Sequence, residues 1–189
     1  MTSDNVLSAD NQQERQQTIH PWYISGFVDG EGSFHIAFCK DKNMKTNLKV
    51  IPEFHISQND HSVRVLENIQ NYLHCGHIKE NHHGRKNDQT FVYVVRNRID
   101  LSEKIIPFFQ KYHLRTQKAK DFEKFAKIVQ KMNTGYHTSI VGAKEIINLA
   151  YTMNDNGKHR IISQNKLIRI VESSETIREA PVKIRPGKI

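Results

Sequence analysis

Cysteine is scarce in this 189-residue sequence, and long apolar runs are absent. The two cysteines, Cys39 and Cys75, lie far apart and form no C-x-x-C pair. The sequence therefore supports neither a zinc site nor a disulfide framework, and it favours a reducing compartment. No apolar run approaches the roughly 20 residues that a membrane helix needs, so we expect no membrane partner. The eleven histidines include no H-E-x-x-H pair.

Targeting signals are also absent. The N-terminal segment contains acidic residues and no apolar core, which argues against a signal or transit peptide. The bacterial cytoplasm, the chloroplast and the mitochondrion all remain open as locations. Residues 1–18 are polar, so we expect a disordered leader there, followed by one domain at 19–160 and a basic C-terminal tail at 161–189.

Positive charge is in excess. Lysine and arginine number 28 against 20 acidic residues, which gives a formal net charge of +8. A basic protein favours a polyanionic partner, because basic side chains that meet phosphates release condensed counterions. Charge alone is weak support for nucleic acid as that partner, and the function must be inferred from motifs.

The apolar residues change their spacing along the chain. A helix is predicted from Pro21, with apolar residues so dense that it should be buried nearly all round. Strands with alternating apolar residues follow at 33–39 and 49–57, then a helix from Ser62, strands at 76–81 and 90–96, and further helices. This order, αββαββ followed by helices, predicts an α+β fold.

The first helix carries the most informative pattern. Gly26 and Gly30 lie four residues apart and so share one helical face, where another backbone could approach closely. Glu31 falls at the helix C-terminus, where the helix dipole disfavours a carboxylate. If the glycine face is a two-fold axis, two Glu31 carboxylates converge, and hard cations such as Mg²⁺ or Ca²⁺ would neutralise them. Taken alone, the pattern is more typical of a packed core helix that ends in a solvated turn.

The segment WYISGFVDGEGSF closely resembles the LAGLIDADG motif, with Ile24 and Ser25 in place of the first Leu and Ala. The resemblance extends through PEFHISQND, EKIIPFF and NLAYTMN, and covers roughly residues 20–160. It indicates a single-motif LAGLIDADG homing endonuclease of the kind encoded by group I introns. The implied fold is αββαββα, with an antiparallel DNA-binding sheet and helices packed on its other face. The implied assembly is a homodimer whose interface includes Ile24, Gly26, Phe27 and Gly30.

The resemblance also implies a metal site. The last acid of the motif binds the divalent metal, expected to be Mg²⁺, and corresponds to Glu31, with the Gly30 carbonyl as a further ligand. Asp29 is expected to stabilise the helix end instead of binding metal.

Three other residues take catalytic roles by resemblance. Gln58 closes the second strand, where the family often has a water-positioning glutamine, although an ordinary surface residue is the alternative. Lys118 resembles the active-site lysine, and Lys120 is the alternative because the register is uncertain by a residue or two. Arg64 is the candidate for a second basic role, and an exposed helix residue of no catalytic consequence is equally compatible.

DNA recognition is expected from the strand positions opposite the core, because side chains on a ribbon can read base edges in the major groove. Alternate polar residues usually face water, so the prediction concerns the group more than any member. The predicted readers are Ser33, His35, Ala37, Cys39, Lys49, Ile51, Glu53, His55, Ser57, Lys79, Asn81 and Arg96. The predicted phosphate contacts at loops are Lys40, Lys45, Arg85 and Lys86.

The function implied is site-specific cleavage of double-stranded DNA at a long pseudo-palindromic target, by metal-dependent phosphodiester hydrolysis. No covalent nucleophile is needed, which agrees with the absence of a Ser-His-Asp or Cys-His pattern. The alternative is an RNA maturase on the same scaffold, with its own intron RNA as partner. A non-cleaving DNA-binding regulator would be expected to lack the motif acid. A small-molecule metal hydrolase fits poorly with so many basic residues.

Overall fold

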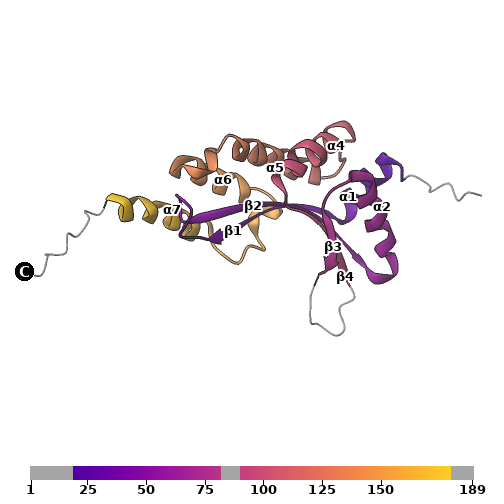
Figure 1. Cartoon of the computed structure of the whole chain (residues 1–189), viewed down its shortest axis with the longest axis horizontal. Helices are drawn as coiled ribbons and strands as arrows, with labels where there is room; N and C mark the ends of the chain where they lie inside the picture. The colour runs from indigo at the N-terminus through magenta and orange to yellow at the C-terminus, as the bar shows by residue number, and fades with distance from the viewer. Residues whose placement is uncertain (1–18, 82–89, 180–189) are drawn as a thin grey trace, which may run out of the picture.

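A computed structural model describes residues 19–81 and 90–179, which fold into one antiparallel sheet with helices on one face. The strands are β1 (Gly32–Lys40), β2 (Leu48–Asn59), β3 (His77–Glu80) and β4 (Thr90–Val95), in the order β1-β2-β4-β3. The helices α4, α5 and α6 lie over one face, and no described helix covers the other face (Figure 1). The α+β prediction is confirmed.

The helical elements complete the predicted order. Their bounds are α1 (Pro21–Glu31), α2 (Val63–Leu73), α3 (Arg98–Asp100), α4 (Ile106–Lys111), α5 (Lys118–Asn133), α6 (Ile140–Ala150) and α7 (Gln164–Glu179). Short 3₁₀ turns occupy Asp60–Ser62, Tyr136–Thr138 and Asp155–Gly157, and a π-helical turn occupies Leu101–Ile105. No helix within residues 19–81 and 90–179 is long and apolar enough to span a membrane.

The main core lies between the sheet and the helices, because the strands bury alternate residues. On β1, Phe34 and Ile36 are buried, and their cross-strand partners on β2 are Phe54 and Pro52. The rings of Phe34 and Phe54 stack with centroids 5.1 Å apart, and Phe109 of α4 packs edge-on against Phe34 at 5.5 Å. Such contacts fix the helix layer on one side and leave the odd-numbered positions of β1 and β2 on the other.

The segment after α6 closes the outer edge of β1. Asn154 donates from Nδ2 to the Phe34 carbonyl at 3.0 Å, and Arg160 donates from Nη1 to the Ile36 carbonyl at 2.8 Å. Arg160 also donates from Nη2 to the Ala150 carbonyl at 3.1 Å. β1 is an edge strand, and these side chains bond two of its carbonyls on the side that faces away from β2.

The sequence predicted that the folded domain ends at residue 160, but the folded part continues beyond that residue. Residues 164–179 form α7, and Leu167 and Val171 are buried against Ala143 and Ile147 of α6 and against Leu48 of β2. The two α7 residues are four apart, so they lie on one face of the helix and pack together against α6. The tail predicted for 161–189 is therefore part of the folded unit at least through α7, and residues 180–189 lie outside the described residues.

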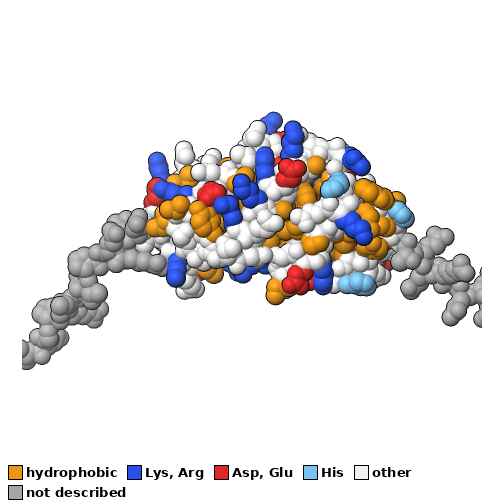
Figure 2. Space-filling view, turned by 90° about the horizontal axis from the view of Figure 1, so that it is seen from above, with side chains coloured by type: hydrophobic (Ala, Val, Ile, Leu, Met, Phe, Trp, Pro, Cys, Tyr) orange, Lys and Arg blue, Asp and Glu red, His pale blue; other side chains and the backbone are white. Residues whose placement is uncertain are grey.

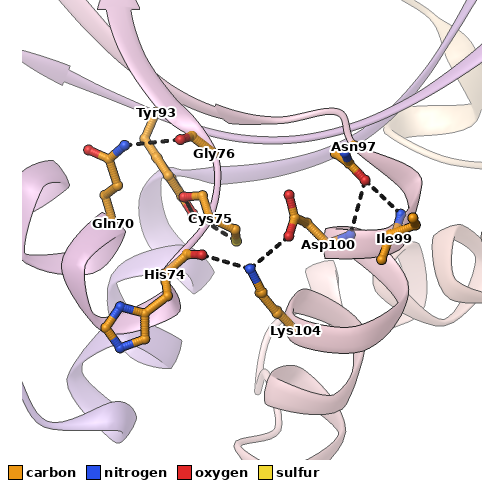
Figure 3. Close-up of polar contacts among 9 residues, drawn as sticks. All are labelled: Gln70, His74, Cys75, Gly76, Tyr93, Asn97, Ile99, Asp100 and Lys104. Atoms are coloured by element: carbon orange, nitrogen blue, oxygen red, sulfur yellow. Dashed lines mark hydrogen bonds and ion pairs between the residues drawn. The ribbon is translucent and has the colours of Figure 1, made fainter.

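The turn between α2 and β3 is held by side chains from three elements (Figure 3). Gln70 donates to the Gly76 carbonyl at 3.0 Å, and Tyr93 donates to the Cys75 carbonyl at 3.0 Å. Lys104 donates to the His74 carbonyl at 2.7 Å and pairs with Asp100 at 2.8 Å. These bonds place β3 beside β4, so the sheet keeps its fourth strand.

Candidate active site and nucleic-acid interface

One face of α1 is exposed and includes two glycines, Gly26 and Gly30. A Cβ atom added to Gly26 or Gly30 would meet nothing within 4 Å. Tyr23, which is 52% exposed, stacks on the half-buried Phe27 with ring centroids 6.0 Å apart. At the end of the molecule that holds α1 and α2, hydrophobic side chains are visible at the surface (Figure 2). Nothing in the described part of the chain therefore covers Gly26 and Gly30.

Two expectations about this helix need correction. Ile24 is fully buried in the core of its own chain, so the prediction that its side chain contacts a partner is wrong. The helix is also not buried on nearly all sides within one chain, since Trp22 and Tyr23 are about half exposed. When a helix is apolar on most sides, the spacing of its apolar residues does not show which face packs in the core and which face is exposed.

Lys118 and Glu31 converge at the end of α1. Glu31 is the last, exposed residue of the helix, and Gly32 begins β1. Lys118, the first residue of α5, donates from Nζ to the carbonyls of Gly30, at 3.2 Å, and Gly32. Burial lowers the pKa of Lys118, while the charges of Asp29, Glu31 and Asp121 act in the opposite direction. This geometry favours Lys118 over Lys120, whose side chain is exposed.

Asp29 explains why Lys118 is held there. Its carboxylate accepts from the backbone N–H of Arg115 at 2.7 Å and of Thr116 at 3.2 Å, and from the Thr116 hydroxyl at 2.8 Å. The Thr116 oxygen in turn accepts from the Lys118 N–H at 3.2 Å. Asp29 thus fixes the start of α5, whereas the sequence predicted that it would stabilise the end of its own helix.

The polar strand positions predicted from the sequence share the open face of the sheet. The register pairs Ser33 with His55 and His35 with Glu53, and continues across β2 and β4 to β3. The odd-numbered residues of β1 and β2 therefore lie on the same face as Lys79, with Arg96 one residue beyond the end of β4. Lys40 and Lys45 are exposed near the β1–β2 turn, whereas Arg85 and Lys86 lie outside the described residues.

His77 on β3 was missed by sequence reasoning. It is exposed and lies opposite Val94, which in turn lies opposite His55. The signal was present, because His77 is two residues before Lys79 and a strand repeats its face every two residues. Val92 and Val94 occupy the same face but are almost fully buried, so the middle of the face is partly apolar.

Glu53 is the centre of a charged group on this face. His55 Nδ1 lies 3.3 Å from Glu53 Oε1, and Arg96 donates from Nε to Glu53 Oε2. The hydrogen bond from His55, followed by that from Arg96, lowers the pKa of Glu53 to about 2 against the opposing effect of burial. Across the strand pair, burial and the charge of Arg160 lower the pKa of His35.

Comparison with known proteins identifies the family. The model of the LAGLIDADG endonuclease family matches residues 24–129, which run from α1 into α5. The chain belongs to the LAGLIDADG endonuclease family. The matched region contains Glu31, Gln58, Lys118 and the whole sheet, so the site described above lies inside the LAGLIDADG domain.

Relatives in sequence and structure agree with this membership. A probable intron-encoded endonuclease 3 of Neurospora crassa is 34% identical over 139 residues, which cover 72% of this chain and 25% of that protein. The archaeal intron-encoded homing endonuclease I-Vdi141I complexed with DNA is 30% identical, with a TM-score of 0.74 over 82% of this chain and 96% of that one. I-SmaMI bound to uncleaved DNA target in the presence of calcium ions is 30% identical, with a TM-score of 0.67 over 72% of this chain and 45% of that one.

The chain spans only about a quarter of the length of the first two curated relatives it matches. By contrast, it spans nearly all of the I-Vdi141I chain. The shared unit is therefore one LAGLIDADG domain with the αββαββα arrangement and the helices that follow it.

The oxygen ligands at the end of α1, the helix that carries the LAGLIDADG motif, suit a hard cation but are few. Within residues 19–81 and 90–179, no three His, Cys, Asp or Glu side chains gather where they could hold a metal ion. One chain offers the Glu31 carboxylate and the backbone carbonyl of Gly30, and that carbonyl already accepts from Lys118. Oxygen donors of this kind fit Mg²⁺ or Ca²⁺.

Gln58 and Arg64 are placed less decisively in the LAGLIDADG domain. Gly32, which directly follows α1, pairs with Ile56 of β2. Gln58 lies two residues further along β2, so the register places it near the end of α1. Its Oε1 accepts from the Asn59 N–H at 3.0 Å. Arg64 is exposed on the first turn of α2 and makes no contact with Glu31 or Lys118 in the described part of the chain. Both catalytic roles stay predictions.

Proposed function

We propose that this chain is a homing endonuclease that cuts both strands of a long, pseudo-palindromic DNA site by metal-dependent hydrolysis. The observation that carries the proposal is at the exposed end of α1, where Lys118 bonds the carbonyls of Gly30 and Gly32 on either side of Glu31. The family membership supports it, as do the printed names of the relatives, which are intron-encoded endonucleases or homing endonucleases with DNA.

The proposed active unit is a homodimer. The exposed Gly26 and Gly30 face allows two copies of α1 to approach closely, because neither glycine has a side chain to separate the backbones. Two copies related by a two-fold axis place two Glu31 carboxylates near each other. The second copy would supply the oxygen ligands that one chain lacks, and a symmetric dimer implies a pseudo-palindromic target.

The proposed chemistry assigns one task to each side chain. A bound Mg²⁺ ion would supply an activated water and stabilise charge on the phosphate. Glu31 would bind the ion, and the Gly30 carbonyl would be a further ligand. Gln58 would orient water at the end of β2. Lys118, already held beside the Gly30 and Gly32 carbonyls, would stabilise negative charge that develops on the scissile phosphate.

The open face of the sheet is the proposed reading surface. It presents polar and basic side chains in register, and the helix layer on the opposite face leaves it accessible. A two-stranded or wider ribbon fits the major groove of DNA, where donors and acceptors distinguish all four base pairs. Lys40 and Lys45 lie at the turn beyond β1, where phosphate contacts would position the chain without reading bases.

The test is cleavage of a DNA library by the purified protein with Mg²⁺, with Ca²⁺ or with EDTA. We expect breaks in both strands at one long site with Mg²⁺, and binding with little cutting with Ca²⁺. The matched control is Glu31→Gln, which keeps the shape and removes the charge. Binding to intron RNA without cleavage of any DNA would overturn the endonuclease proposal in favour of a maturase.

A further inference from the structure

We propose that Glu53 is a positioning residue that presents Arg96 and His55 to the DNA bases, and that it does not read a base itself. This inference rests on the proposed function, because it concerns the face that would enter the major groove. It changes the expectation that Glu53 is one of the residues that read DNA bases. The inference follows from the exposure of the Glu53, His55 and Arg96 side chains and from the contacts between them.

The three side chains lie at different depths on the open face. The side chain of Glu53 is 14% exposed, that of His55 is 29% exposed, and that of Arg96 is 50% exposed. The carboxylate therefore lies beneath the two groups that it holds. Each of its oxygens already has a partner, since Oε1 faces His55 and Oε2 accepts from Arg96. A carboxylate that is 14% exposed and has a partner on each oxygen has less room and fewer free lone pairs for a cytosine amino group.

The contact with Glu53 prepares Arg96 for bidentate recognition. Arg96 uses Nε for this hydrogen bond, and its terminal nitrogens make no other bond to the described residues. One anchored nitrogen fixes the plane of the guanidinium group, so less freedom is lost when the other two donate. Two parallel donors match the O6 and N7 acceptors of guanine in the major groove.

The same carboxylate selects the state of the His55 ring. A carboxylate only accepts hydrogen bonds, so the contact requires the proton of His55 to be on Nδ1. The other ring nitrogen, Nε2, is then left to face a ligand, as an acceptor when the ring is neutral. His55 lies between Ser33 and Val94 in the register, near the middle of the sheet. One acid thus sets the geometry of two readers.

Base preference separates a positioning role from a reading role. The experiment selects bound sequences from a randomised site with wild type, Arg96→Ala, Glu53→Gln and the double variant, in Ca²⁺. Lys49→Ala is the matched control, because Lys49 is on the same strand and face but outside this group. We expect Arg96→Ala to weaken one guanine preference in each half-site by about 5- to 150-fold. Glu53→Gln should weaken that same preference, and the double variant should match Arg96→Ala.

A different pattern would overturn the inference. If Glu53→Gln removes a cytosine preference at other positions and its effect adds to that of Arg96→Ala, Glu53 reads a base directly. The Lys49→Ala control should change preferences elsewhere in the site and leave the guanine position untouched.

Nuclear magnetic resonance of the free protein tests the same inference without DNA. The nitrogen shifts should show His55 protonated on Nδ1 and a slowly exchanging Arg96 Nε–H in wild type. At least one of the two signals should change in Glu53→Gln, because the amide replaces one of the two carboxylate oxygens with an NH2 group that cannot accept a hydrogen bond. Unchanged signals would refute the positioning role. Normal signals together with no DNA selectivity would instead refute the proposed function.

Discussion

Lys118 Nζ donates to the backbone carbonyl of Gly32, at the residue where α1 ends and β1 begins. The contact joins the first residue of α5 to the end of the LAGLIDADG helix, across 86 residues of sequence. It depends on Asp29, which bonds the backbone of residues 115 and 116 just before α5. The lysine therefore has a fixed place beside Glu31, and it is not a freely rotating surface group.

Replacement of Glu31 by glutamine should lower the cleavage rate by orders of magnitude and leave DNA binding nearly unchanged. The reason is that the variant removes the charge that we propose binds the metal, without removing volume. Cleavage and gel-shift assays on the same target would measure the two effects. Glu123→Gln, at an exposed position of α5, is the matched control for loss of one acid. Cleavage at nearly the wild-type rate by Glu31→Gln would refute its assigned role.

Lys118→Met should reduce cleavage far more than Lys120→Met, because only Lys118 contacts the carbonyls beside Glu31. The pH profile gives a second measurement. Burial lowers the pKa of Lys118, so the charged form is lost at a lower pH than for an ordinary lysine. If the charged form acts in catalysis, cleavage should fall as pH rises through this lowered value. Equal activities of the two variants would contradict the assignment.

Gly30→Leu should abolish the dimer without unfolding the chain. A side chain at this position meets nothing within 4 Å in one chain, but it would separate the two α1 helices of the proposed dimer. Analytical ultracentrifugation would measure the mass, and a cooperative thermal unfolding transition would show that the variant chain is still folded. Gly32→Ala is the contrasting variant, since its Cβ would lie 2.5 Å from Val28 Cγ1 and should cost about 1–3 kcal/mol. A wild-type monomer at micromolar concentration would refute the dimer.

Lys45→Ala should weaken binding to all DNA sequences alike. If Lys45 contacts a phosphate, its loss should reduce the slope of log affinity against log salt concentration by about one unit. Lys49→Ala should instead alter base preference, by roughly 1–3 kcal/mol at symmetric positions. Titrations at several salt concentrations, with a randomised site, would separate the two effects. Altered base preference in Lys45→Ala alone would reverse the assignment.

The charged group around Glu53 should contribute to stability at neutral pH and lose that contribution in acid. The pKa of Glu53 is lowered from 4.5 to about 2, so the folded state favours the carboxylate. The contribution is complete above pH 4.5 and disappears as pH falls toward 2. The difference in free energy of unfolding between wild type and Glu53→Gln should therefore shrink over that interval. A constant difference from pH 6 to pH 2 would contradict the shift.

Much of the sheet could be predicted because a strand repeats every two residues. Phe34 and Ile36 defined the core face, and so placed His35 and Ala37 on the other. The pair of Glu53 and Arg96 could not be predicted. Its register depends on how β2 and β4 align across α2 and β3, which no local pattern specifies. The place of Lys118 was predicted from the family resemblance, and spacing alone would not have found it.

The errors at α1 and α7 have a common cause. Local spacing indicates that a face is apolar, but not what covers it. Ile24 was assigned to a partner and belongs to the core, while Leu167 and Val171 were assigned to a tail and bury against α6. Only the three-dimensional arrangement tells whether an apolar residue meets its own chain or another.

The two side chains on the outer edge of β1 restrict how copies of this protein can associate. Asn154 and Arg160 occupy carbonyls of Phe34 and Ile36 that an incoming strand would need. A second chain cannot extend the sheet there without displacing both. Strand-to-strand association of two copies is therefore blocked at this edge of the sheet.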